Sequence, residues 1–154
     1  MLKLTKKADY GLIALNHLAV YHGRSSASAK EIAGRYRIPL PLLSKVLQKL
    51  AKSGFLAAEQ GTRGGYRLAR DPQRISALEV IRAIDGPIIL TSCLHGECDQ
   101  SERCTVREPL RRVHEGILSL LAGITITDMA SEERLYSLEE WTPALREPQV
   151  EYLR

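Results

Sequence analysis

The amino-acid sequence predicts a mainly α-helical fold with one small β-hairpin and a long helix after it. Apolar residues recur every three or four positions through much of the chain, which is typical of amphipathic helices. One stretch changes to alternating apolar and polar residues on either side of a glycine-rich turn, which indicates a hairpin. A later stretch repeats apolar residues in alternating steps of three and four, which favours a helix with a continuous apolar seam.

Three helices are expected before the hairpin. The first covers about residues 4–21. The second is short and begins at a capping box over Ser28–Glu31, in which the serine accepts from a backbone N–H and the glutamate reaches back. The third covers residues 39–53, because proline suits a first helical turn and Gly54 suits a left-handed stop.

The hairpin is expected to pair residues 55–60 with residues 66–70 across the glycine-rich tip, residues 61–65. A further helix is predicted after a second capping box, Ser76–Glu79. It should stop at the turn Asp85–Pro87, since glycine and proline end helices.

The long helix is expected from about Thr105 or Pro109 to about Ala122. Thr105 and Glu108 resemble a capping box, which would start the helix directly after Thr105. In the alternative start, Glu108 is the N-cap residue and Pro109 is the first residue of the helix. The apolar seam of this helix consists of Val106, Leu110, Val113, Ile117, Leu120 and Ile124. It spans under three heptads, which is too short to hold two chains together unaided.

Charge is distributed unevenly along the chain. Residues 1–75 carry 14 Lys and Arg against 4 Asp and Glu, a balance of +10, whereas residues 76–154 carry 8 against 14, a balance of −6. A basic half beside an acidic half suggests that one end of the molecule meets a polyanion.

The chain carries no run of about 18 apolar residues and no small-residue cleavage site after its basic start, so neither a membrane span nor a signal peptide is expected. We therefore expect a cytoplasmic protein. Its 3 cysteines should be reduced there, and an odd count fits poorly with a disulfide framework.

Three helices followed by a hairpin is the element order of a winged helix-turn-helix, which predicts binding to double-stranded DNA. The helix of residues 39–53 would enter the major groove, and the hairpin tip would touch the adjacent backbone or minor groove. A core helix with a solvated basic face is the alternative for its lysines taken alone, and Leu42 can instead belong to the core. The candidate DNA-binding residues are Lys3, Leu42, Ser44, Lys45, Gln48, Lys49, Arg63, Gly64, Gly65 and Arg67.

The three cysteines follow the spacing Cys93-x4-Cys98-x5-Cys104 in a loop between two helices. Thiolates select zinc, copper(I) or iron–sulfur clusters, and the spacing is wider than the close pairs of structural zinc sites. Free thiols or a redox disulfide pair are the alternatives. The nearby side chains that could supply a fourth ligand are His95, Glu97 and Glu108, although such residues are more often solvated loop residues than ligands. A fourth ligand can also come from elsewhere, including a partner chain. An enzyme is not expected, because no third group or oxyanion loop accompanies Cys93 and His95.

Taken in order, the motifs resemble the Rrf2 family of bacterial winged-helix regulators over about residues 1–130. The resemblance rests on LTKKADYGL, SAKEIAGRYRIPLPLLSKVLQKLAKSGFL, GTRGGYRLAR, ISALEVIRAIDGP and the cysteine loop. The segments DGPIILTSC and LAGITITDMA make the regulators of SUF iron–sulfur assembly the most similar branch. The resemblance implies a homodimer that pairs through the long helix and binds a cluster through three cysteines, with the state of the cluster controlling operator binding.

The resemblance also bears on the fourth ligand. Cys93, Cys98 and Cys104 match the family's cysteines, although the first gap is four residues where better-known cluster regulators have five. Arg107 stands where one branch has a ligating histidine. Asp9 matches the first-helix aspartate that completes the site from the partner chain in another branch. The resemblance therefore implies Asp9 as the fourth ligand, with a plain surface carboxylate as the alternative.

The expected organisation is a winged helix-turn-helix over residues 1–86, a cluster-binding loop over 87–104, a dimerisation helix with a short terminal helix over 105–130, and a loosely ordered tail over 131–154. The expected function is a homodimeric transcription repressor of iron–sulfur assembly or stress genes, dependent on a [2Fe-2S] or [4Fe-4S] cluster and without a small-molecule substrate or membrane partner. Two alternatives stay open: a thiol- or zinc-based winged-helix regulator, and a regulator that docks on a metabolic enzyme.

Overall fold

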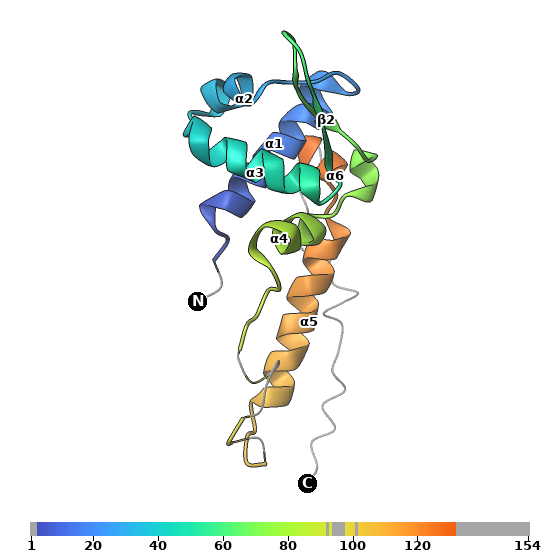
Figure 1. The fold of residues 1–154 in the computed structure, drawn as a ribbon. Coiled ribbons are helices and arrows are strands. Elements are labelled where there is room, and N and C mark those ends of the chain that lie inside the picture. Colours follow the sequence, from blue (N-terminus) through green and yellow to red (C-terminus); the bar gives the residue numbers. More distant parts are fainter. Residues whose placement is uncertain (1–2, 92, 94–97, 101, 132–154) are drawn as a thin grey trace.

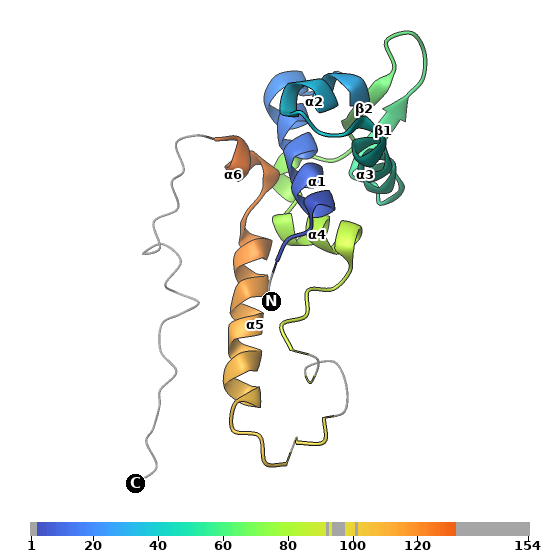
Figure 2. The ribbon, with the colours of Figure 1, turned by 90° about the vertical axis from the view of Figure 1, so that its left-hand side faces the viewer.

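The structure is a computed structural model that describes residues 3–91, 93, 98–100 and 102–131. It has a winged-helix body, made of helices α1–α4, a hairpin and α6, from which the long helix α5 extends as a stalk (Figure 1). The segment between α4 and α5 is hereafter called the cysteine loop. It leaves the body after α4, and its last described residues, just before α5, lie at the far end of the stalk in both side views (Figures 1 and 2). The elements in order are α1 (Lys6–His17), the π-helical turn η1 (Leu18–His22), α2 (Ala29–Tyr36), α3 (Leu40–Lys52), β1 (Leu56–Glu59), β2 (Gly65–Leu68), the 3-10 turn η2 (Pro72–Arg74), α4 (Ala77–Asp85), α5 (Arg107–Gly123) and α6 (Ile126–Ala130). The predicted fold class, mainly α with a hairpin wing, is confirmed.

Side-chain caps begin four of the α-helices. At α1 the Thr5 hydroxyl accepts from the Ala8 N–H at 3.2 Å. The box at Ser76 and Glu79 is complete, with each residue bonded to the other's backbone N–H. Thr125 and Asp128 form a second complete box at α6. At α2 only half of the predicted box is present: the Ser28 hydroxyl accepts from the Glu31 N–H at 3.1 Å, whereas the Glu31 carboxylate contacts His22.

The core of the body lies between α1, α2, α3 and α4, and it receives one apolar side chain or more from each. Leu15, Ile32, Leu47 and Val80 are all 0% exposed. Each buried side chain of this size contributes about 1.5–3 kcal/mol through removal of apolar surface from water. The four helices therefore form a folded unit within one chain.

The hairpin pairs β1 with β2 in antiparallel register, with Ala58 opposite Tyr66. A third segment joins its edge, because Ala27 and Tyr66 exchange two backbone hydrogen bonds of 3.0 and 2.8 Å. Gly65 lies so close to Ala27 that a Cβ atom at Gly65 would stand 2.3 Å from the Ala27 carbonyl oxygen. Glycine at this position thus lets the wing dock on the body.

Helix α5 begins at neither of the two predicted positions. It starts at Arg107, after Val106, and within the described part of the chain no side chain caps it. The N–H of Leu110 donates to the Val106 carbonyl at 3.0 Å. Pro109 occupies the third helical position, where its missing N–H costs nothing because N–H groups of the first turn have no acceptor within the helix.

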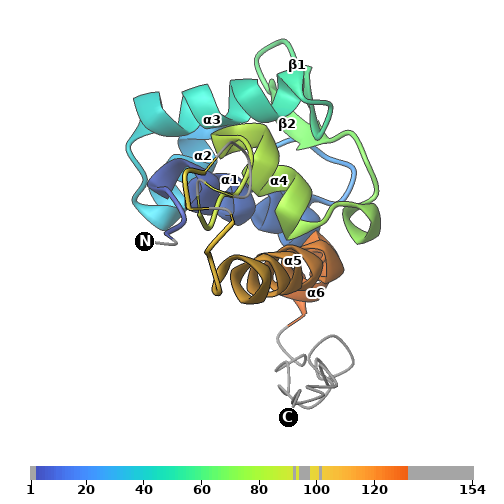
Figure 3. The same ribbon diagram turned by 90° about the horizontal axis from the view of Figure 1, so that it is seen from below.

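The apolar seam of α5 is only partly covered. The single buried residue of the helix is His114, which is not part of the seam. The seam residues Val106 and Val113 are 56% and 52% exposed. The helix packs against α4, and α3 lies on the opposite side of α1 and α4 when the molecule is viewed from below (Figure 3). An apolar stripe of this kind is typical of a surface that another chain covers.

The chain returns to the body after α5. The N–H of Ala77 donates to the Ile124 carbonyl at 2.8 Å, and the N–H of Ile126 donates to the Ile75 carbonyl at 2.9 Å. Ile126 is 0% exposed in the core. The upper end of the stalk is thereby bonded to the start of α4. The tail expected to be loosely ordered lies, beyond residue 131, outside the described residues. Within the described part of the chain, no helix is long and apolar enough to cross a membrane.

Candidate DNA-binding surface and cysteine loop

Helix α3 presents one apolar face to the core and one polar face to the outside. Leu43, Val46, Leu47 and Leu50 are buried. The predicted contacts Lys45 and Gln48 are exposed, and Ser44 and Leu42 are half-buried at the margin. A polar helix face on the outside of a helix-turn-helix is the surface that enters a major groove.

Lys49 is held differently from the other candidates on α3. Its Nζ donates to the Ile84 carbonyl at 2.6 Å, in the last turn of α4. The last carbonyls of a helix lack intrahelical partners and carry partial negative charge, so they favour a cation there. In this structure Lys49 therefore joins α3, the candidate recognition helix, to α4.

The wing carries the remaining candidates. Arg63 is exposed at its tip, while Arg67 Nε donates to Glu59 Oε1 at 2.8 Å across the two strands. Glycine is needed at positions 64 and 65 for the fold itself, apart from any approach to DNA. A Cβ atom at Gly64, for example, would stand 2.5 Å from the Glu59 carbonyl oxygen. Lys3, before α1, is exposed.

Cys93, Cys98 and Cys104 are free thiols, each partly buried. The Cys93 Sγ lies 3.3 Å from the Thr91 hydroxyl. Among the described residues, the three thiols are not gathered within 4.8 Å of one another, and His17, His22 and Glu31 are the set that is. The donor set fits an iron–sulfur cluster by its chemistry, because thiolates are the ligands that such clusters use.

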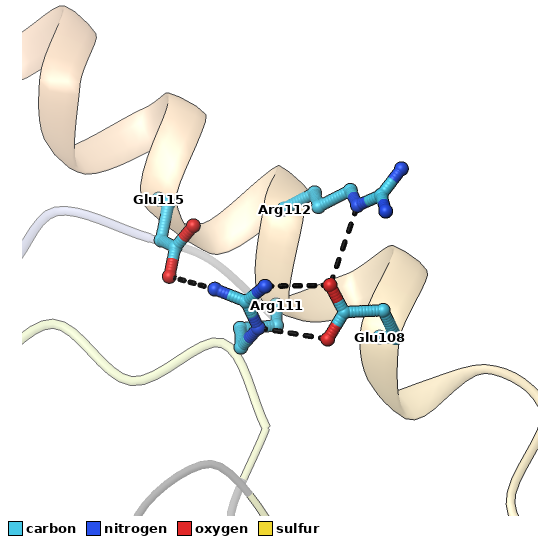
Figure 4. A network of polar contacts seen from close by, with 4 residues as sticks. All are labelled: Glu108, Arg111, Arg112 and Glu115. Atoms are coloured by element: carbon cyan, nitrogen blue, oxygen red, sulfur yellow. Dashed lines mark hydrogen bonds and ion pairs between the residues drawn. The ribbon is translucent and has the colours of Figure 1, made fainter. Parts of the chain in front are cut away.

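The candidate fourth ligand Glu108 already has partners (Figure 4). The guanidinium of Arg111 donates to both of its carboxylate oxygens, at 2.8 and 2.5 Å, and Arg112 Nε donates at 3.3 Å. These hydrogen bonds and charges lower the pKa of Glu108 to about 2. Arg111 also pairs with Glu115, so the carboxylate belongs to a surface network along α5. His95 and Glu97 lie outside the described residues.

Asp9 is exposed on α1, in the body. The described residues of the cysteine loop that directly precede α5 lie at the far end of the stalk, away from α1 (Figures 1 and 2). Among the described residues, Asp9 and the cysteines of its own chain do not form a group of ligand atoms within 4.8 Å of one another.

Sequence reasoning missed one group of side chains in the body. His17, His22 and Glu31 come together where α1 ends and α2 begins. Two histidines five residues apart do not share a face of an ordinary α-helix, so helical periodicity does not predict the group.

Comparison with known proteins identifies the family. Residues 4–132 match the family Rrf2, described as an iron-dependent transcriptional regulator. The chain is 31% identical over 140 residues to the HTH-type transcriptional regulator IscR of Vibrio vulnificus strain YJ016, covering 90% of this chain and 83% of that protein. It is 35% identical over 136 residues to an rrf2-like HTH-type transcriptional regulator of Rhodobacter capsulatus, covering 82% and 91%.

Solved structures give the same result. CymR (YrzC), the global cysteine regulator of B. subtilis, is similar with a TM-score of 0.73 and 31% identity, covering 84% of this chain and 97% of that chain. T. potens IscR is similar with a TM-score of 0.65 and 29% identity, covering 90% and 96%. The relatives are transcription regulators and not enzymes, as expected. The chain therefore belongs to the Rrf2 family and is a DNA-binding transcriptional regulator with a winged helix-turn-helix.

Proposed function

We propose that this regulator is a repressor of iron–sulfur assembly or stress genes whose operator binding depends on an iron–sulfur cluster held by Cys93, Cys98 and Cys104. One observation carries the proposal: all three thiols lie in the loop that joins α4, which packs on the recognition helix, to the stalk helix α5. The family's description as iron-dependent and the relatives named IscR support it. Membership of the SUF branch stays a prediction.

A bound cluster would supply redox and oxygen sensitivity, because its thiolate ligands and iron oxidise readily. The chain's own contribution is the attachment of the loop to the body. Lys49 of α3 bonds the Ile84 carbonyl at 2.6 Å. The Thr5 hydroxyl, at the start of α1, donates to the Asp85 carboxylate at 2.8 Å. Both bonds lie at the end of α4, immediately before the cysteine loop, so a displacement of that end would shift α1 and α3.

We propose that two copies pair through the seam of α5, since Val106 and Val113 expose apolar surface along it. In such a homodimer two copies of α3 must span half-sites about one DNA turn, roughly 34 Å, apart. A small change in the direction of each α3 then weakens paired binding. The fourth ligand is proposed to be Asp9 of the partner subunit, because the family resemblance points to it, and because Asp9 is exposed and, among the described residues, forms no ligand group with the cysteines of its own chain.

The proposal is tested by oxygen-free purification. The expected product is coloured and contains iron and acid-labile sulfide, and Cys93→Ser, Cys98→Ser and Cys104→Ser each remove the visible absorbance. Asp9→Ala should leave the fold intact and change the spectrum or its oxygen sensitivity, whereas the exposed carboxylate variant Asp71→Ala should not. A colourless preparation without iron or sulfide overturns the cluster, and an unchanged Asp9→Ala spectrum overturns only the fourth ligand.

A thiol-based regulator is the second candidate. It is favoured by the similarity to CymR, described as a global cysteine regulator, and by the partial exposure of the three cysteines, which lets oxidants reach them. Metal analysis separates the two: the thiol regulator would contain no iron, and its operator affinity would respond to oxidants through disulfide formation. Zinc in place of iron and sulfide would identify the zinc-based form.

A further inference from the structure

A second group of potential metal ligands lies in the body, apart from the cysteines. His17, His22 and Glu31 each offer one ligand atom, and the three atoms lie within 4.8 Å of one another. Two of the residues come from α1 and η1, and the third comes from α2, the first helix of the helix-turn-helix. The group therefore forms only when these elements pack together in the folded body, and no single helix supplies all three side chains.

The π-helical turn η1 explains how the two histidines meet. Residues five apart diverge by about 140° around an α-helix, because each residue advances about 100°. The wider π turn, with its i to i+5 hydrogen bonds, brings such residues back toward one side. The rings of His17 and His22 accordingly lie 5.1 Å apart between centroids. Single π turns within helices are frequent at functional sites.

His17 has the hydrogen-bonding pattern of a metal ligand. The residue is 2% exposed, and its Nδ1 lies 3.2 Å from the Tyr36 hydroxyl. Its Nε2 is buried and has no hydrogen-bond partner among the residues that the structure describes. Histidines that bind metals commonly use one ring nitrogen as ligand while the other donates to an oxygen.

His22 likewise has one ring nitrogen near an oxygen outside the group and the other directed toward the group. Its Nδ1 lies 3.4 Å from the Ser25 hydroxyl, and its Nε2 lies 3.1 Å from the Glu31 carboxylate. The side chain of Glu31 is half exposed, so the group is open to ions from solvent. Ligand atoms of a tetrahedral zinc site lie about 3.4 Å apart, a spacing that the His22–Glu31 pair already approaches.

We propose that His17 Nε2, the His22 imidazole and the Glu31 carboxylate bind one divalent cation of the zinc class, with water in the fourth position. Two imidazoles and a carboxylate are a ligand set that suits this ion, and the site is separate from the proposed cluster. The bound ion joins the end of α1 to the start of α2. The ion therefore fixes the position of the helix-turn-helix relative to α1. It also stabilises the folded protein, because a ligand that binds only the folded state raises the stability of that state.

The test uses the full chain with Cys93→Ser, Cys98→Ser and Cys104→Ser, which removes every thiolate that could bind the probe. Zn²⁺ alone is added in competition with a chelator, and bound zinc is counted per chain after dialysis. About one zinc per chain is expected, together with a higher melting temperature. His22→Gln and Glu31→Gln should each weaken zinc binding by roughly tenfold or more and abolish the rise in melting temperature.

Glu59→Gln is the matched control, because Glu59 is also a half-exposed carboxylate in an ion pair, with Arg67 at 2.8 Å. It should bind zinc as tightly as its parent. The proposal is overturned if the parent retains no zinc, or if His22→Gln and Glu31→Gln bind as tightly as Glu59→Gln. Should the serine variant not fold, Co²⁺ is added to the reduced native chain: a visible band without thiolate charge transfer that His22→Gln removes supports the site, and its absence overturns it.

Discussion

The body and the stalk are stabilised in different ways. The body buries a continuous set of apolar side chains, among them Leu15, Ile32 and Leu47 at 0% exposure. The stalk helix α5 buries only His114, and it exposes Val113 to 52%. A single chain therefore buries the core of the DNA-binding body by itself, whereas the stalk presents an uncovered apolar seam. The difference agrees with the proposal that the signal changes the stalk and its pairing while the body stays intact.

The largest expected effect is in the core of the body. Leu47→Ala should lower the free energy of unfolding by about 3 kcal/mol, because it removes a fully buried side chain and leaves a cavity. Chemical denaturation followed by circular dichroism measures this. The loss should be the same at every protein concentration, and a loss that shrinks at high concentration would mean that pairing, not the core, stabilises the body.

The next effect concerns the docking of the wing. Gly65→Ala places a Cβ atom 2.3 Å from the Ala27 carbonyl oxygen, so the hairpin must shift away from the body. The expected cost is roughly 2 kcal/mol of stability, in the range of other overpacking substitutions. DNA affinity should fall as well. The control is Ala58→Gly, which changes one methyl group at an exposed position on the facing strand. Equal DNA affinity for the parent, Gly65→Ala and Ala58→Gly would contradict a docked wing.

Substitution in the stalk should change pairing rather than folding. Val113→Glu puts a charge on the exposed seam, and the dissociation constant of the proposed dimer should rise roughly tenfold or more, a change of about 1.4 kcal/mol. Analytical ultracentrifugation measures it. Ser119→Glu, exposed on α5 but off the seam, should pair normally. Identical dissociation constants for the two variants would rule out the seam as the interface.

The smallest effect is electrostatic. The Ser76 backbone N–H, and next the Arg70 guanidinium, lower the pKa of Glu79 below its ordinary value of 4.5. A lowered pKa in the folded state gives stability that is present above the unfolded pKa and is lost as the pH falls through the folded pKa. Glu79→Gln should therefore cost about 0.5 kcal/mol at neutral pH, since the side chain is 45% exposed. The difference from the parent should vanish in acid, and a difference independent of pH would show that the charge is irrelevant.

Local signals predicted most of the body. The capping box at Ser76 and Glu79, the proline start of α3 and the glycine-rich hairpin act within a few residues, so the sequence alone indicates them. Thr125 and Asp128 show that the same local signal also occurs at α6, where sequence reasoning did not use it.

Contacts between distant residues were not predictable in this way. The pairing of Ala27 with Tyr66 and of Ser76 with Thr125 depends on how whole elements pack. The start of α5 was predicted wrongly because two cap signals competed, and the helix uses neither. The group of His17, His22 and Glu31 depends on a π turn, and no periodicity of an ordinary helix predicts it.

The role of the three cysteines as cluster ligands is a prediction from their spacing and from the family resemblance. The contacts at the end of α4, where the loop begins, could not be predicted in this way. One of them is the bond from Lys49 to the Ile84 carbonyl, which joins residues 35 apart in sequence. The sequence analysis placed Lys49 among the candidate DNA-binding residues, and that assignment stays a prediction beside its bond to the Ile84 carbonyl.

The most direct test of the account is operator affinity with and without the cysteine-bound cofactor. The chain is purified without oxygen, and its binding to DNA from its own upstream region is measured by fluorescence anisotropy, at one salt concentration, against Cys93→Ser/Cys98→Ser/Cys104→Ser and against the chain after removal of iron. The account predicts affinities that differ by roughly tenfold or more between the cofactor-loaded chain and both depleted forms. Equal affinities for all three would contradict the claim that the loop at the end of the stalk controls DNA binding by the body.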